Sequence, residues 1–288
     1  MSAKLAYSRH DDDVQPEDVT DDVPSEDLQR LKNEYYHAHV VVDEKAAHAI
    51  EMSTREQSRA TSSTGEQLWY AERQKRITAS KVGGIAKMRK GTKRANKVKQ
   101  MLYSKFHGNK HTSYGLDNED PAREAYISYM HQSGHNGLST SNVGLVISSE
   151  NPWLAASPDD RVHDPQASLP HGLSEYKNPS AAKDMTIDEA CEKIKGFCIK
   201  NNMNTKHKHL DTNHNYYYQI QCQLYCDKKQ WCDFVVKTEN DLYVERVYRN
   251  ETWWSTQLKT LEDFYFNALL PEIACPRIHS GGIREPTD

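Results

Sequence analysis

The spacing of apolar and polar residues changes after Gly134, where short alternating runs replace longer helix-like ones. Alternation with a period of two is typical of strands that bury one face. Turn-forming residues separate three such runs, which predict short strands at 138–148, 153–164 and 172–178. Two later runs, at 231–238 and 241–249, predict a β-hairpin.

Helical periodicity dominates elsewhere. Residues 25–57 are helix-like but weakly amphipathic, and 64–75 opens with the Thr-x-x-Gln spacing of a capping box. Ser80 stands where a helix N-cap belongs, and Pro121 is tolerated because it falls in a first helical turn. Further helices are predicted at about 92–106, 119–130, 187–195, 215–228 and 251–270. The order of helices, strand cluster, helix, hairpin and helix predicts an α/β fold, with a β-sheet flanked by helices.

The chain of 288 residues is long enough for one large domain with tails. It has no run of roughly 18 apolar residues and no secretory signal pattern, so we expect an intracellular protein, without distinguishing nucleus from cytoplasm. Its six cysteines are then expected to be reduced thiols. A zinc site is the alternative for Cys222 and Cys226 with nearby histidines, although their spacing matches no common ligand pattern. Those histidines are His207, His209 and His214.

Charge is unevenly distributed along the chain. Residues 1–27 hold nine acidic and two basic residues, which predicts a disordered acidic tail. Residues 73–110 hold thirteen lysines and arginines and no acidic residue. Solvated helices usually mix both signs, so this run indicates a partner rich in phosphate.

A candidate site lies in the predicted strands. Glu175 and Lys177 share one face of a strand, while Tyr176 faces the other side. Asp159, at the end of the preceding strand, can meet Glu175 across the intervening turn. Mg²⁺ prefers one or two carboxylates, with water and substrate phosphate as the other ligands. Lys177 could hold the attacking water or stabilise the phosphate in the transition state, although an isolated Glu-x-Lys pattern is also common in ordinary surface hairpins.

Five segments occur in the order of a known family: WYAERQKRITAS (69–80), YGLDNEDPAR (114–123), WLAASPD (153–159), GLSEYKNP (172–179) and YYYQIQ (216–221). Together they resemble the YqaJ-type viral recombinase exonucleases, the family of phage lambda exonuclease within the PD-(D/E)xK nuclease superfamily. The resemblance implies a restriction-endonuclease-like fold, a central mixed β-sheet flanked by helices. It divides the chain into an acidic tail (1–27), a helical extension (28–62), a nuclease domain (63–278) and a C-terminal tail (279–288).

The resemblance also implies roles for single residues. Asp159, Glu175, the Tyr176 carbonyl and Glu119 would bind two Mg²⁺ ions, for which Mn²⁺ could substitute. Lys177 would be the general catalyst, and Gln219 would orient it. The terminal 5′-phosphate of DNA would be held by Arg73, Ser80 and Ser157, with Lys81 and Arg76 as further DNA contacts. An arginine fork and hydroxyl groups beside a helix N-terminus are suited to an anion on physical grounds alone.

The implied activity is metal-dependent hydrolysis of duplex DNA from free ends, 5′ to 3′, in recombination, repair or mobile-element processing. A ring of three subunits and a single-strand annealing protein are the implied partners. Asp160 stands where the family has glycine, so either Asp159 or Asp160 could face the metal; with Asp159 as ligand, Asp160→Asn should do little. A DNA-binding protein that does not cut and an endonuclease of the same superfamily are the alternatives.

Overall fold

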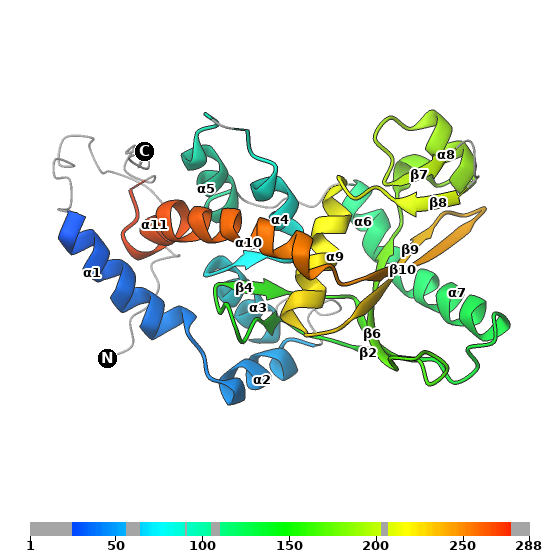
Figure 1. Cartoon of the computed structure of the whole chain (residues 1–288), viewed down its shortest axis with the longest axis horizontal. Helices are drawn as coiled ribbons and strands as arrows, with labels where there is room; N and C mark the ends of the chain where they lie inside the picture. The colour runs from blue at the N-terminus through cyan, green and yellow to red at the C-terminus, as the bar shows by residue number, and fades with distance from the viewer. Residues whose placement is uncertain (1–24, 56–63, 90, 105–109, 203–206, 278–288) are drawn as a thin grey trace.

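A computed structural model describes residues 25–55, 64–89, 91–104, 110–202 and 207–277 (Figure 1). Of the predicted acidic tail, only residues 25–27 belong to this set, and they begin a helix; the predicted tail 279–288 lies outside it. The helices are α1 (Ser25–Tyr35), α2 (Glu44–Ser53), α3 (Thr64–Gln74), α4 (Ala79–Ala86), α5 (Arg94–Leu102), α6 (Lys110–Asp117), α7 (Glu119–Gln132), α8 (Ile187–Lys193), α9 (Asn215–Cys226), α10 (Glu251–Phe264) and α11 (Leu270–Ala274).

The strands form three sheets. They are β1 (Ile77–Thr78), β2 (Ser139–Asn142), β3 (Val146–Ile147), β4 (Leu154–Ala156), β5 (Asp160–His163), β6 (His171–Lys177), β7 (Ile199–Asn202), β8 (His207–Leu210), β9 (Trp231–Lys237) and β10 (Leu242–Tyr248). The main sheet has the order β10-β9-β6-β5-β2, with β6 and β9 parallel and the other neighbours antiparallel. A second sheet has the order β1-β4-β3, and β7 and β8 form a hairpin of their own.

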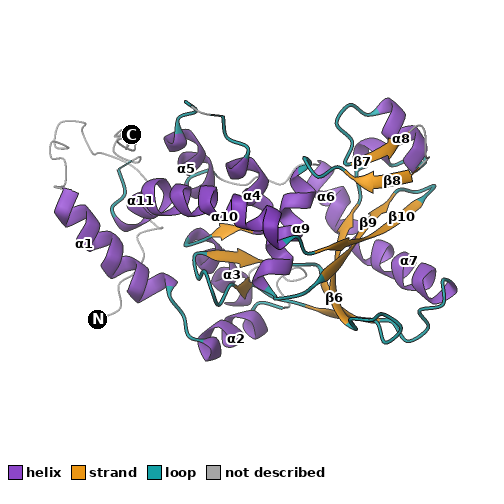
Figure 2. Cartoon of the chain, viewed as in Figure 1, coloured by secondary structure: helices purple, strands orange, loops and turns teal. Residues whose placement is uncertain are grey.

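Helices cover both faces of the main sheet (Figures 1 and 2). On one face, Tyr126 of α7 packs against Tyr176 of β6, with ring centroids 6.0 Å apart. On the other face, Leu224 of α9 belongs to the same apolar cluster as Leu173 of β6. This arrangement confirms the predicted α/β fold with a central mixed sheet. Because side chains alternate along a strand, Glu175 shares the α9 face with Leu173.

The predicted strand 153–164 is wrong as a single element. It is divided into β4, in the second sheet, and β5, in the main sheet. Pro158 lies between them and has no backbone N–H to donate to a strand ladder. The predicted strand 138–148 is divided in the same way, into β2 and β3. The chain therefore passes from one sheet to the other at 157–159, where the candidate site begins.

Several predicted helices also differ in detail. The helix expected over 25–57 ends after a short π-helical turn, and a new helix, α2, begins at Glu44. Its N-cap is Asp43, whose carboxylate accepts from the Ala46 N–H at 2.7 Å. The N-cap of α4 is Thr78, and Ser80 is the second helical residue. Helix α6 and the β7–β8 hairpin were not predicted. The expected hairpin of β9 and β10 is confirmed.

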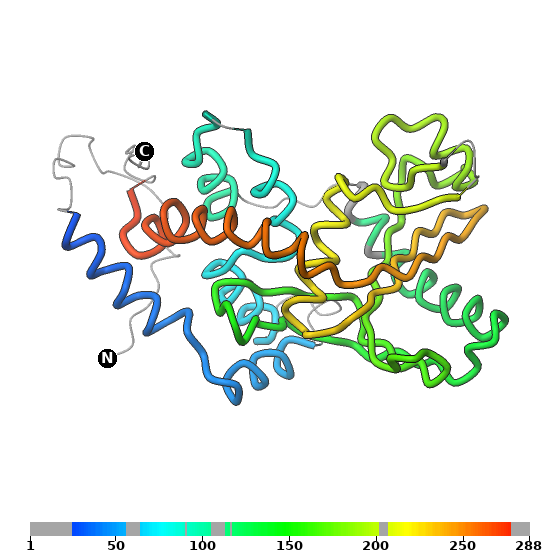
Figure 3. Tube along the Cα trace, in the orientation of Figure 1, coloured from blue at the N-terminus to red at the C-terminus, as the bar shows by residue number. Residues whose placement is uncertain are grey.

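The N-terminal extension packs against the second sheet. The Thr54 hydroxyl accepts from the Leu145 N–H at 2.7 Å, and the Glu51 carboxylate accepts from the Gly144 N–H at 3.1 Å. A Cβ on Gly144 would overlap the Glu51 carbonyl, so only glycine permits this close approach. Figure 3 shows α1 lying beside α11, which brings together the two ends of the described chain.

Within the ranges that the structure covers, no helix combines the length and apolar character needed to cross a bilayer. All six cysteines lie in those ranges as free thiols, and four of them are buried. Cys222 and Cys226 are neighbours on α9, with their sulfur atoms 4.0 Å apart in the apolar core.

Candidate active site

Glu175 and Lys177 lie on β6, the middle strand of the main sheet. Glu175 is 1% exposed and forms a close ion pair with Lys177. Its Oε1 accepts from Gln219 Nε2 at 2.5 Å, and its Oε2 accepts from Gln223 Nε2 at 2.6 Å. Both amides come from α9, so this helix fixes both oxygens of the buried carboxylate.

Lys177 is placed among acids. Burial acts to lower the pKa of its ammonium group, but Glu175 and Asp159 outweigh this effect and raise the pKa above its ordinary value. The ammonium also lies 4.9 Å from the ring centroid of Tyr216. Lys177 is therefore a cation held between two carboxylates and an aromatic face.

Asp159 and Asp160 face different surroundings, as alternation along a strand requires. Asp159 immediately precedes β5, and its Oδ2 accepts from the Tyr176 backbone N–H at 2.6 Å. Burial, followed by the charge of Glu175, raises the pKa of Asp159 well above its usual value. Asp160 is fully buried on the α7 side, where its Oδ2 accepts from Arg123 Nε at 2.6 Å. The geometry thus brings Asp159, and not Asp160, toward Glu175.

Asp160 nevertheless has a clear structural role. Its Oδ2 also accepts from the Tyr176 hydroxyl at 2.9 Å. The expectation that Asp160→Asn should do little is therefore revised. Removing this charge would leave Arg123 without its closest buried counter-ion, and breaking such a buried pair is costly.

Glu119 is the first residue of α7. Burial raises the pKa of its carboxyl group, and Glu175 and Asp160 add to this effect, whereas Arg123 opposes it. Arg123 Nη2 donates to Glu119 Oε1 at 3.3 Å. The charge of Glu119, at the α7 N-terminus, thus acts on Asp159, and the charge of Glu175 acts on Glu119.

The oxygen donors of this site suit a Mg²⁺ ion bound by two carboxylates better than a metal ion bound by three or more protein side chains. Among the described residues, no three histidine, cysteine, aspartate or glutamate side chains are close enough to hold a metal ion by themselves. Asp159 and Glu175, with the Tyr176 carbonyl, would instead provide hard oxygen ligands, and burial, followed by the charges of Glu175 and Glu119, raises the pKa of Asp159. This excess of buried carboxylate suits Mg²⁺ bound by two side chains, with water and phosphate as the remaining ligands.

Arg73, Lys81 and Ser157 are together named the cationic pocket, and Ser157 lies two residues before Asp159. The Arg73 guanidinium stacks over the Trp69 ring, 3.9 Å from its centroid, and the Trp69 indole donates to Ser157 Oγ at 3.2 Å. Burial lowers the pKa of Arg73 to about 10. Burial and the charge of Arg73 likewise lower the pKa of Lys81. No carboxylate pairs with Arg73 or Lys81 in the described part of the chain, so the half-buried Arg73 and the exposed Lys81 are suited to an anion from outside.

The other residues predicted for DNA binding differ from one another. Ser80 is exposed on α4, and its hydroxyl lies 3.5 Å from that of Thr78. Arg76 is 1% exposed and donates to Glu72 Oε2 at 2.5 Å and to the Pro152 carbonyl at 2.7 Å. Its guanidinium is used in contacts inside the protein. We therefore leave Arg76 out of the proposed DNA surface.

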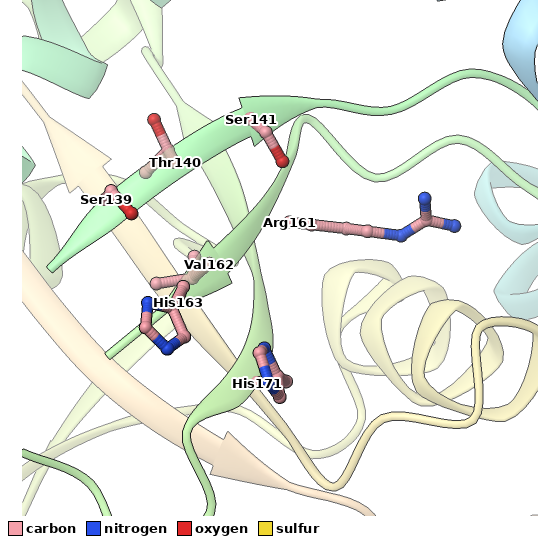
Figure 4. Close-up of a pocket in the computed structure, with 7 residues that line it drawn as sticks. All are labelled: Ser139, Thr140, Ser141, Arg161, Val162, His163 and His171. Carbon is pink, nitrogen blue, oxygen red and sulfur yellow. The ribbon is translucent and has the colours of Figure 1, made fainter. Parts of the chain in front are cut away.

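A separate small hollow of about 190 Å³ opens at the far ends of β5 and β6 (Figure 4). Its lining residues are Ser139, Thr140, Ser141, Arg161, Val162, His163 and His171. Arg161 extends out of it toward α9, where its Nε donates to Asp227 at 2.8 Å. The predicted site residues do not line this hollow, so it is distinct from the carboxylate site.

Two residues that contact the site had no predicted role. The sequence places Gln223 on the same helical face as Gln219, and in the structure Gln223 binds the second oxygen of Glu175. Trp69 is the first residue of one of the five segments, and in the structure it supports both Arg73 and Ser157. Their i,i+4 spacings, Gln219 to Gln223 and Trp69 to Arg73, are the signals that identify them.

The central mixed sheet, with Glu175 and Lys177 on its middle strand, is the arrangement expected of the PD-(D/E)xK nucleases that the sequence resembles. Residues 68–230, more than half of the chain, match the family model of the YqaJ-like viral recombinase domain, and the chain belongs to that family. A similar solved structure is the alkaline exonuclease LHK-Exo from Laribacter hongkongensis, with 23% identity and a TM-score of 0.52, covering 72% of this chain and 95% of that one. The structure of LHK-Exo in complex with dAMP has 22% identity and a TM-score of 0.53, and the match covers 72% of this chain and 95% of that one. At these identities the likeness shows the fold alone. None of the curated proteins matches the sequence.

Proposed function

We propose that this protein is a metal-dependent exonuclease that hydrolyses one strand of duplex DNA from a free 5′ end. One observation carries the proposal. The short segment 157–159 contributes Ser157 to the cationic pocket and Asp159 to the carboxylate site. A terminal phosphate held in the pocket would therefore lie close to the phosphodiester bond beside the carboxylates.

The carboxylate site has the groups needed for hydrolysis. Asp159, Glu175 and the Tyr176 carbonyl would hold Mg²⁺, with Glu119 reaching an ion or its water. When bound, Mg²⁺ would lower the pKa of a water and draw charge from the phosphate oxygens. Gln219 and Gln223 fix the Glu175 carboxylate, so this ligand needs little rearrangement. Lys177 places a positive charge beside Glu175, where charge develops on the phosphate.

The cationic pocket would select the ends of DNA as the substrate. A terminal phosphate carries more charge than a phosphate within the strand and presents more oxygens to a planar guanidinium. Burial and the charge of Lys81 lower the pKa of Lys97, which shows that Lys97 of α5 lies close enough to Lys81 to continue the basic surface. An anchored end would position the first internucleotide bond at the carboxylates, which favours cutting from the terminus.

Cleavage of linear and covalently closed duplex DNA of the same sequence separates the proposed function from its alternatives. With Mg²⁺ present, we expect nucleotides to be released from the linear molecule while the closed circle stays intact. Cutting of both substrates would indicate an endonuclease. Binding of linear DNA without any cutting would indicate a non-catalytic DNA-binding protein. Either result would overturn the exonuclease proposal.

A further inference from the structure

We infer that Arg123 is a positioning residue that sets Glu119 and Asp159 at the spacing a shared metal site requires, an inference that rests on the proposed function. Arg123 lies one helical turn after Glu119 and donates to it at 3.3 Å through Nη2. Its Nε donates to Asp160 at 2.6 Å. A single guanidinium thus connects the first residue of α7 to the first residue of β5.

Tyr176 extends this connection to Asp159. Its hydroxyl donates to the Asp160 oxygen that also accepts from Arg123, and its backbone N–H donates to Asp159. The guanidinium carbon lies 5.5 Å from the centroid of the Tyr176 ring. Asp159 precedes the paired residues of β5, so the strand ladder does not hold it directly. Its position depends on Tyr176 and on Asp160, the next residue along the chain.

The shape of the guanidinium matters as much as its charge. Asp160 is fully buried and needs a cation with its donors in a fixed plane. Arginine can donate to two carboxylates from different nitrogens, whereas a lysine ammonium on a flexible stem cannot hold both at a set spacing. Arg123 has this arrangement because its Nε and Nη2 serve acids on two separate elements. Lysine would restore the charge but not the spacing.

The test compares Arg123→Lys, Arg123→Met and Asp160→Asn with the wild-type protein. For each, kcat and KM are measured on linear duplex DNA at saturating Mg²⁺, and Mn²⁺ affinity is measured by calorimetry without DNA. We expect kcat and metal affinity to fall about 10- to 100-fold in all three variants, as for other residues that orient metal ligands. KM for DNA should stay nearly constant, because the cationic pocket is untouched.

Arg246→Lys is the matched control. Arg246 is likewise partly buried, donates to Asp233 at 2.8 Å and stacks over Trp231, but it contacts no residue proposed for the site. We expect Arg246→Lys and Arg123→Lys both to lower the melting temperature. Arg246→Lys should do so with little change in kcat or Mn²⁺ affinity.

Two results would overturn the positioning role. One is recovery of wild-type kcat and Mn²⁺ affinity in Arg123→Lys, which would show that charge alone suffices. The other is an equal loss in Arg246→Lys, which would show a general effect of weakening a buried ion pair. If the wild type binds Mn²⁺ but cuts no DNA, the proposed function fails, while the Mn²⁺ affinities of the variants still decide the role of Arg123.

Discussion

Lys177→Ala is expected to abolish DNA cleavage while DNA binding survives. The ammonium lies at Glu175, where charge would develop on the scissile phosphate, and loss of such a group costs about 100- to 1,000-fold in rate. DNA affinity should depend mainly on phosphate contacts with the basic surface of α4 and α5. Nucleotide release from linear duplex DNA and binding to the same DNA, measured on the same preparation, test both parts.

Lys193→Ala is the control for this variant, because Lys193 is exposed on α8 and its ion-pair partner among the described residues is Glu189, at 2.8 Å. It should retain wild-type cleavage. A correctly folded Lys177→Ala protein with full activity would refute the catalytic assignment. Loss of binding in parallel with cleavage would show that Lys177 acts mainly in holding the substrate.

The second large effect is expected at the DNA end. If Arg73, Ser80 and Ser157, together with Lys81, hold a 5′-phosphate, its binding energy positions the scissile bond. Removing the phosphate should then slow the chemical step as well as weaken binding. We expect wild-type protein to digest 5′-phosphorylated ends about 10- to 100-fold faster than 5′-hydroxyl ends. Arg73→Ala should lose most of this preference. Arg73→Lys should also be impaired, because an ammonium cannot reproduce a planar fork or its stacking on Trp69.

Initial rates on matched duplexes that bear either end give the preference for each variant. Arg89→Ala is the control, since Arg89 is an exposed member of the same basic run, distinct from the proposed pocket. It should weaken DNA binding on both substrates alike and keep the preference for phosphate. Equal wild-type rates on both ends would refute the phosphate anchor. Loss of nucleotides mainly from 3′ ends would reverse the proposed polarity.

Local patterns predicted much of the site, because its main residues lie close together in sequence. Period-two alternation placed Glu175 and Lys177 on one face, and helical spacing placed Gln219 and Gln223 together. Alternation also required Asp159 and Asp160 to face opposite ways. It could not decide which one meets Glu175, because the answer depends on the break between the two sheets.

Contacts between segments that are far apart in the sequence could not be predicted from local sequence patterns. Nothing in residues 44–53 indicated that Glu51 would accept from the Gly144 N–H, which ties the N-terminal extension to the second sheet. The basic run wrongly suggested that Arg76 is available to contact DNA. Its boundary at Arg73 excluded Glu72, the i,i+4 partner that keeps Arg76 inside the protein. A charge run must therefore be examined together with the residues one helical turn on either side.

The central claim is that Asp159 and Glu175 form a metal-dependent hydrolytic site. Its most direct test is nucleotide release from a linear 5′-phosphorylated duplex by chelator-treated protein as Mg²⁺ is added, for wild type and Glu175→Gln. The glutamine keeps the size of the side chain and removes its charge. The account predicts no release in chelator, restoration by Mg²⁺ or Mn²⁺ in the wild type, and an inactive variant at every metal concentration. Release in the presence of chelator, or a variant as active as the wild type, would contradict it.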